Sequence, residues 1–177
     1  MPLRPVGIVL AAALLAAGAV ACRPLPARSV KNGRVPEYML TSVTPQCSVV
    51  SRLAGRLEAM LRAAHRDGVA LEPEQTSFLP PDAPQPPVIE SCYRSYDGQV
   101  WWRNYYCSIG KCELAAVPGT SIHGFGRAVD FQDQEGEMAF GSPGFVWLEA
   151  HAAEFGFAHP DWAEEGQPGA EPWHWEG

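Results

Sequence analysis

The chain has 177 residues, a length that suits one domain with a substantial core. Its composition is acidic, with a formal net charge of −7, and the excess is regional: no Lys or Arg follows Arg127, whereas eleven Asp and Glu do. Such a negative field repels phosphate backbones and attracts cations, so we expect no nucleic-acid partner, although a solvated acidic surface accounts for most of these charges.

The N-terminus has the pattern of a secretory signal. Residues 1–21 carry one positive charge, Arg4, then the apolar run VGIVLAAALLAAGAVA, which ends in small residues. No comparable apolar run follows, so nothing else in the sequence predicts a membrane span. We therefore expect an exported protein, extracellular or in the cell envelope, with a signal peptide at 1–21, a tether or lead-in at 22–47 and one domain at 48–177.

Cleavage after this signal leaves Cys22 as the first residue, and the stretch AVAC resembles a bacterial lipobox, whose cysteine receives lipid and holds the protein on a membrane. That motif usually has Leu where this chain has Ala19, and ordinary secretion with a chance cysteine is the alternative. Without Cys22, the chain keeps an even number of cysteines, which suits two disulfides in an oxidising compartment and slightly favours the anchor. The four are Cys47, Cys92, Cys107 and Cys112.

The predicted elements begin with an amphipathic helix, because Leu53, Leu57, Met60, Leu61 and Ala64 recur at helical spacing. Ser51 is available as its cap and Gly68 lies beyond its end. The proline-rich stretch 72–87 predicts a loop, and VIESCYRS at 88–95 predicts a short strand. DGQVWWRNYYC then predicts a helix, and CSIGKC a tight loop that a Cys107–Cys112 bond can close.

The C-terminal half predicts a strand over 127–131, and then a helix that starts at Ser142 and Pro143 and stops at Gly156. The last residues, EPWHWEG, predict a strand, in which Trp173 and Trp175 face the core, away from the histidine between them. This mixture of elements predicts an α+β fold, with a small antiparallel sheet flanked by helices.

Two segments carry residues that suit a catalytic metal. His123 and Asp130 lie seven residues apart in SIHGFGRAVD, and the tail supplies Glu171 and His174. Two histidines and one carboxylate form a three-ligand zinc set that leaves one tetrahedral position for water, and Glu171 beside it can take a proton from that water. A cysteine-based zinc site is the rival hypothesis, and an oxidising compartment disfavours it.

SIHGFGRAVD together with EPWH resembles the zinc D-Ala-D-Ala metallopeptidases, bacterial D,D-carboxypeptidases and D,D-dipeptidases that share their fold with the Hedgehog signalling domain. Their pattern is Ser-x-His-x-x-Gly-x-Ala-x-Asp, then Glu-x-x-His, and this chain fills every fixed place. SCYRSYDGQ is similar to the family's Ser-Gly-Tyr-Arg-Ser segment, so the resemblance covers roughly residues 88 to 177. The chain departs from the family at Cys92, where a glycine is usual.

The resemblance implies a zinc site at the sheet, with His123, Asp130 and His174 as ligands. It implies that Glu171 is the catalytic acid/base and that Arg94 faces the substrate, with Ser121 as a further substrate-binding residue. We thus expect a monomeric D-alanyl-D-alanine carboxypeptidase that acts on peptidoglycan stem peptides.

A peptidoglycan endopeptidase and a non-catalytic zinc-containing binding module are the alternatives. We favour the carboxypeptidase, because we expect no appended wall-binding module of the kind that an endopeptidase often uses. A Cys47–Cys92 disulfide would tie the site segment to the first helix, but the four cysteines allow three pairings, among which the sequence does not choose.

Overall fold

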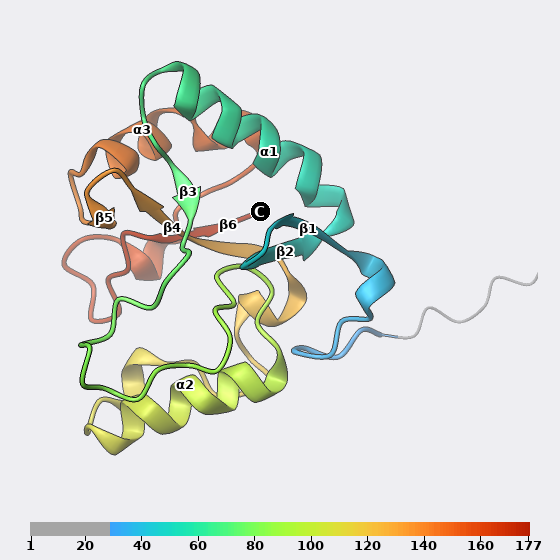
Figure 1. Ribbon diagram of the computed structural model, residues 1–177, viewed down its shortest axis with the longest axis vertical. Coiled ribbons are helices and arrows are strands. Elements are labelled where there is room, and N and C mark those ends of the chain that lie inside the picture. Colours follow the sequence, from blue (N-terminus) through green and yellow to red (C-terminus); the bar gives the residue numbers. More distant parts are fainter. Residues whose placement is uncertain (1–28) are drawn as a thin grey trace, which may run out of the picture.

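The computed structural model describes residues 29–177, so the predicted signal peptide and Cys22 lie outside the described residues. Figure 1 shows helices α1 (Ser51–Arg66) and α3 (Pro143–His151) on one side of a small sheet, and α2 (Tyr96–Ser108) on the other side. This is the predicted α+β fold, with a small antiparallel sheet flanked by helices. Within 29–177, no helix is both long enough and apolar enough for a membrane crossing.

The sheet is organised around strand β4 (Ala128–Asp133), which the sequence predicts to within two residues at its C-terminal end. Three short strands pair antiparallel with it. They are β3 (Glu72–Pro73), β5 (Gly136–Glu137) and β6 (His174–Glu176). The predicted C-terminal strand is therefore confirmed, although it covers only the last part of EPWHWEG.

The register of β4 and β6 determines which side chains lie on each of the two faces of the sheet, called here the chemical face and the core face. Asp130 lies opposite His174, and Val129 lies opposite Trp175. Because side chains alternate along a strand, Val129, Phe131 and Trp175 enter the hydrophobic core, while Asp130 and His174 point to the other face. The core placement of Trp175 is confirmed. Trp173 precedes the strand, and it packs at the edge of the core and also lines the cavity described below, so its prediction is only partly right.

Helix α1 buries the predicted apolar face, with Leu53, Leu57, Met60 and Ala64 inaccessible to solvent. The prediction that Ser51 caps this helix is wrong. Ser51 is the first helical residue, and its hydroxyl donates to the carbonyl of Met39 and makes no cap hydrogen bond. The cap position falls on Val50, whose backbone N–H donates to the Gly126 carbonyl instead.

Residues before Ser48 contain ordered elements where the sequence predicted only a tether or lead-in. A short 3₁₀ turn, Glu37–Met39, leads into strand β1 (Leu40–Thr44), which forms an antiparallel hairpin with β2 (Cys47–Val50). The strand pattern is hard to see in the sequence because β1 has a mixed burial pattern and the hairpin is irregular near Ser42 and Thr44.

The predicted strand at 88–95 is wrong, because this segment forms no ladder with a single partner. Its backbone bonds instead to three separated parts of the chain: Ser91 and Tyr93 donate to Gln46 and Ser48 in the hairpin, Arg94 donates to His123, and the Ser91 carbonyl accepts from Asp130 N. The Cys47–Cys92 disulfide ties the segment to β2. The segment is therefore an irregular strap that connects the hairpin to the chemical face of the sheet.

Both remaining predicted helices are confirmed, with caps that differ in origin. The Ser95 hydroxyl accepts a hydrogen bond from Gly98 N at the start of α2, and Cys107–Cys112 closes the loop after it. At α3 the Ser142 hydroxyl makes no cap hydrogen bond, and donates to Asp133 at 2.8 Å. Asp133 in turn accepts from Gly144 N at 2.7 Å, so a strand carboxylate caps this helix.

Candidate active site

Three buried side chains that the sequence singled out converge on one point. His123 comes from the 3₁₀ turn Ile122–Phe125, Asp130 from β4 and His174 from β6. His123 Nε2, His174 Nδ1 and Asp130 Oδ1 are each 3.1 Å from the other two atoms. Each residue is at most 5% exposed. The structure thus brings together three donors that could hold a metal ion.

The turn that carries His123 depends on a glycine. Gly126 has φ of 65°, in the left-handed region, and its carbonyl accepts from Val50 N at 2.9 Å. A Cβ at Gly126 would lie 2.9 Å from that same nitrogen. A side chain here would therefore separate the turn from the hairpin and move His123 away from the sheet.

The outer nitrogens of both histidines are held by acceptors. His123 Nδ1 donates to the Cys92 carbonyl at 2.7 Å, and His174 Nε2 lies 3.4 Å from Glu176 Oε1. A carbonyl oxygen only accepts, so the neutral His123 ring directs its lone pair on Nε2 inward. The donation from His174 to Glu176 likewise leaves Nδ1 free to bind a metal. With both rings neutral, two imidazole lone pairs and a carboxylate oxygen at these separations repel one another, so this donor set fits a shared proton or a metal cation at its centre.

The pKa values of the three groups agree with a proton or a cation at the centre of the donor set. Burial lowers the pKa of His123 to about 4, so its ring is neutral at physiological pH. The pKa of Asp130 lies well below its usual range, because contacts with His123, His174 and Arg94 outweigh the effect of burial. Burial disfavours the charged His174 ring, but hydrogen bonds to Asp130 and Glu176 raise its pKa to about 9. The metal-free site thus holds a proton that a cation can replace.

Glu171 lies beside this group but is not one of its three donors. Its Oε2 is 3.9 Å from His174 Nδ1, and its side chain is 25% exposed to the cavity. Burial, together with the charge of Asp130, raises the pKa of Glu171 to about 7. A carboxyl group with this pKa can both accept and donate a proton near neutral pH, as general acid/base catalysis requires.

His159 has a positioning role beside the donor group. Its ring is 6% exposed at the side chain and packs against Phe145 and Trp175. Its Nε2 donates to the backbone carbonyl of Glu171 at 3.0 Å. His159 therefore anchors the loop that presents Glu171, and it does not touch the donor group.

Arg94 lines the same cavity, and it is also paired with a member of the donor group. Its Nη2 donates to Asp130 Oδ2 at 2.8 Å, and its guanidinium lies 5.8 Å from the centre of the Trp102 ring. Its Nε is buried without a hydrogen-bond partner among the described residues. The predicted substrate-facing cation is thus oriented by a carboxylate and an aromatic ring.

Ser121 precedes the turn that carries His123 and also lines the cavity. Its carbonyl accepts a hydrogen bond from Asn32 Nδ2 at 2.6 Å. Asn32 Oδ1 in turn accepts from Gln99 Nε2 at 3.0 Å. The wall of the cavity at Ser121 is therefore supported by residues from the N-terminal segment and from α2.

The cavity itself has a volume of about 480 Å³, enough for a short peptide segment, and is lined by residues of the chemical face of the sheet and of α2. Sequence reasoning missed several of its lining residues, above all Glu74, Glu137, Trp102 and Tyr106. Burial, with a contribution from the charge of Glu171, raises the pKa of Tyr106 to about 12. The pair of aromatics in WWRNYY was the available signal, since Trp102 and Tyr106 are four residues apart and stack on one face of α2.

The chain matches the family model described as VanY, D-alanyl-D-alanine carboxypeptidase, over residues 83–176. It is 30% identical over 130 residues to the D-alanyl-D-alanine carboxypeptidase of Enterococcus faecalis (strain ATCC 700802 / V583). That match covers 70% of this chain and 46% of the relative, so the chain spans about half the length of the curated relative that it matches.

Two solved structures share the fold. One is the vancomycin-resistance D,D-pentapeptidase VanY from a VanB-type resistance cassette, solved as a mutant in complex with Zn(II). Its TM-score is 0.57, and it is 23% identical over 77% of this chain and 76% of that one. The other is the LdcB LD-carboxypeptidase, with a TM-score of 0.58 and 20% identity over 83% of this chain and 74% of that one. At these identities the likeness concerns the fold.

Proposed function

The chain belongs to the VanY family of D-alanyl-D-alanine carboxypeptidases, and on that premise we propose that it is a zinc-dependent peptidase that removes the terminal D-alanine from peptidoglycan stem peptides. One observation carries the proposal: His123, Asp130 and His174 converge on one point, with Glu171 beside them in the same cavity. A purely structural zinc site is closed by its protein ligands, whereas three donors at the wall of a cavity leave room for a substrate.

In this proposal His123 Nε2, His174 Nδ1 and Asp130 Oδ1 hold the zinc. When bound, zinc would act as a Lewis acid on the scissile carbonyl and lower the pKa of water to about 7. The three-donor set is what supports zinc, and the related VanY structure was solved with Zn(II).

Three other side chains around the donors have separate roles in the proposed reaction. Glu171 accepts a proton from the attacking water and then gives it to the departing amine nitrogen. Arg94, held in place by Asp130 and Trp102, contributes its remaining N–H groups to the C-terminal carboxylate of the peptide or to the oxyanion that forms at the carbonyl. Ser121 lines the wall and offers a hydroxyl to the bound peptide.

The product mass tests this proposal against its alternatives. The zinc-loaded protein is incubated with a pentapeptide that ends in D-Ala-D-Ala, and in parallel with the tetrapeptide that lacks the last residue. Loss of one alanine from the pentapeptide alone supports a D,D-carboxypeptidase, and cleavage of the tetrapeptide indicates L,D specificity. Cleavage of cross-linked peptides at an internal bond indicates an endopeptidase, and peptide binding without any cleavage indicates a binding module.

The cellular location is part of the proposal as well. The sequence pattern of residues 1–22 supports export to the extracellular space or cell envelope, with a lipid anchor on Cys22. Mass spectrometry of the native N-terminus tests it, since a diacylglyceryl adduct on Cys22 supports the anchor and an unmodified cysteine rejects it. We also propose a monomer, which light scattering of the purified domain checks.

A further inference from the structure

Strand register places acidic side chains on the chemical face of the sheet on both sides of Asp130. Pro73 lies opposite Phe131, and Glu74, the next residue, donates its backbone N–H to the Asp130 carbonyl at 2.9 Å. On the other side, Glu137 lies opposite Gln132. Because side chains alternate along β4, Asp130 and Gln132 share a face, and their cross-strand neighbours Glu74 and Glu137 share it too.

Glu74 is the inner member of this pair, and its carboxylate has no hydrogen-bond partner among the described residues. Glu74 is partly exposed to solvent, and it lines the cavity. Glu72, on the same strand, differs in this respect, because its carboxylate accepts a hydrogen bond from the Gln75 side chain. A partly exposed carboxylate that lines a cavity and has no protein donor is free to accept a hydrogen bond from a ligand that supplies the donor.

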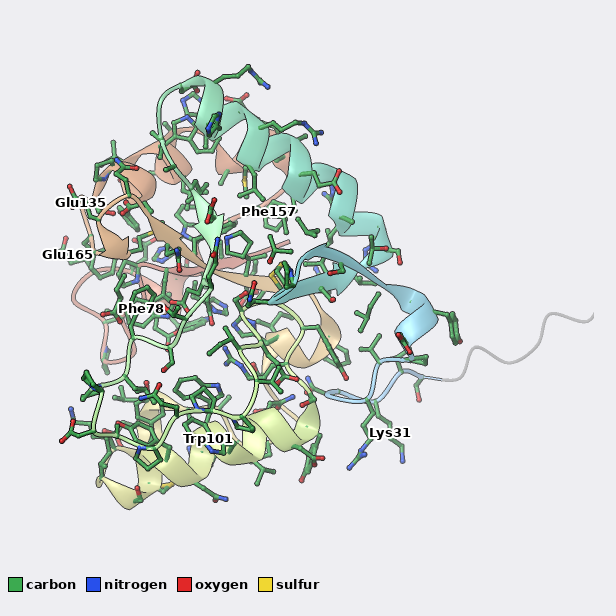
Figure 2. All side chains as sticks on the ribbon, viewed as in Figure 1. Lys31, Phe78, Trp101, Glu135, Phe157 and Glu165 are labelled. Carbon is green, nitrogen blue, oxygen red and sulfur yellow. A yellow bond between two sulfur atoms is a disulfide. The ribbon has the colours of Figure 1, made fainter. Side chains whose placement is uncertain are left out.

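Glu137 is the outer member, on an exposed strand at the mouth of the cavity, and it has no salt-bridge partner among residues 29–177. Phe78, in the loop after β3, lines the same part of the cavity. A Cβ on Gly136 would lie 3.9 Å from the Phe78 ring, so this loop lies against the β5 turn (Figure 2). The two carboxylates thus border a partly apolar wall, which suits an aliphatic chain that ends in a charged group.

The cavity also carries an excess of negative charge, which favours a cationic ligand. Among the residues that the structure describes, six carboxyl groups line it against a single arginine, and that arginine is paired with Asp130. Asp130 and Glu176 are engaged with the histidines, and Glu171 is assigned to proton transfer. A divalent metal therefore leaves the wall around Glu74 and Glu137 negatively charged.

We propose that Glu74 and Glu137 form a subsite for a primary ammonium group on the substrate, the free side-chain amine of a diamino-acid residue upstream of the cleaved bond. The inference rests on the proposed function and specifies its substrate as the peptide whose side-chain amine is not cross-linked. Arg94 then takes the anionic end of the peptide and the Glu74–Glu137 wall takes the cationic side chain, so the two contacts fix the direction in which the peptide lies.

The test compares two pentapeptides that differ only at this amine, one free and one acetylated. Acetylation removes the charge and keeps most of the aliphatic chain. Dissociation constants are measured by calorimetry on zinc-loaded Glu171→Gln protein, so that hydrolysis is slow during the titration, and kcat/KM is measured on the wild type. We expect the free amine to be preferred by about tenfold or more in both measurements.

Variants assign the preference to these residues. Glu74→Gln, which keeps the shape of the side chain, is expected to reduce the preference to about twofold or less, and Glu137→Gln at the exposed mouth is expected to reduce it in part. Glu135→Gln is the matched control, because Glu135 is an exposed glutamate on the turn before β5 and does not line the cavity (Figure 2). It removes the same charge and should leave the preference as it is.

The outcomes separate this inference from the function on which it rests. If the two peptides bind with equal affinity and are cleaved at equal rates, the ammonium subsite is wrong. The cleavage itself would still support the proposed peptidase. A preference that survives both Glu74→Gln and Glu137→Gln also overturns it. A second metal ion bound by the wild type and lost in Glu74→Gln would assign the pair to a cation of another kind. If the wild type neither binds nor cleaves any stem peptide, the proposed function fails first.

Discussion

Arg94 and Asp130 form an ion pair at 2.8 Å between Nη2 and Oδ2, while the other carboxylate oxygen, Oδ1, faces both histidines. One carboxylate thus connects the candidate metal-binding group to Arg94, the only arginine among residues 29–177 that lines the cavity. The guanidinium helps to keep Asp130 ionised, and Asp130 fixes the guanidinium at the edge of the site. The candidate metal-binding group and the predicted substrate contact are therefore one connected unit.

This pair leads to a prediction about the bond that is cut. If Arg94 receives the terminal carboxylate, Arg94→Lys should lower kcat/KM for a free pentapeptide by about a hundredfold, because Lys lacks the planar, two-pronged donor geometry. Amidation of the peptide C-terminus should lower kcat/KM of the wild type to a similar degree. It should lower kcat/KM of the Arg94→Lys variant little further. Steady-state kinetics on the four combinations check this. Equal wild-type rates on free and amidated peptides would instead favour the endopeptidase.

The metal-binding group is tested by metal content. The wild type should bind about one zinc per chain, and His123→Ala or His174→Ala should weaken zinc binding by at least about a hundredfold, because each removes one of three donors. His151→Ala is the control, since His151 is 41% exposed at the side chain and contacts Glu154 away from the cavity. Metal analysis after dialysis measures the loss. Full zinc retention in both variants would contradict the assignment.

The role of Glu171 is tested by separating metal binding from turnover. Glu171→Gln should retain zinc and the fold but lose hydrolysis by about a hundredfold or more, because the amide can neither accept nor deliver the proton. Glu165→Gln, an exposed position before the same loop, serves as the control. Kinetics and metal analysis on the same samples are required. A variant with near wild-type turnover would remove Glu171 from the mechanism.

The two disulfides should differ in their effect on stability and on the metal site. The sequence separation is 45 residues for Cys47–Cys92 and 5 for Cys107–Cys112. Chain-entropy arguments predict losses of about 4 and about 2 kcal/mol when each pair is replaced by alanine. Only the first pair should also weaken zinc binding, because the Cys92 carbonyl orients His123. Urea unfolding and zinc titration measure both effects, and equal zinc affinities in the two variants would count against this link.

Glu74 should make the stability of the metal-free protein depend on pH. Burial raises the pKa of Glu74 in the folded state, so its contribution is most favourable below the unfolded-state pKa and is lost as pH rises through the folded-state pKa. Glu74→Gln removes this loss, and the variant should be more stable than the wild type at pH 8, with a difference that shrinks toward pH 4. Urea unfolding across this range provides the check, and a difference independent of pH would refute the account.

Much of the candidate site could be predicted because its residues lie in two short segments. His123 and Asp130 are seven residues apart, and Glu171 and His174 are three apart. Residue types alone limit the chemistry there, because imidazole and carboxylate groups suit zinc. Helices α1 and α2 could be predicted for a similar reason, since their signal is contained within one stretch of chain.

The misplaced features depend on distant partners. The segment 88–95 has a composition that fits a strand, but its hydrogen bonds go to three separate segments, which no local pattern encodes. Asp133 caps α3 from another element, so the cap could not be assigned from the residues next to the helix. Glu74 gave no signal because it lies in a proline-rich stretch that predicted only a loop.

The sequence by itself determined which residues can bind a metal and which carboxylate can move a proton, because those properties belong to the side chains. The tertiary structure decided that Asp130 lies opposite His174, that Cys47 pairs with Cys92, and that Glu74 and Glu137 share the wall of the cavity. Each of these depends on the register between segments far apart in the chain. That register is set by packing of the whole core, since a shift of one residue in β6 would turn His174 into the core and Trp175 into the cavity.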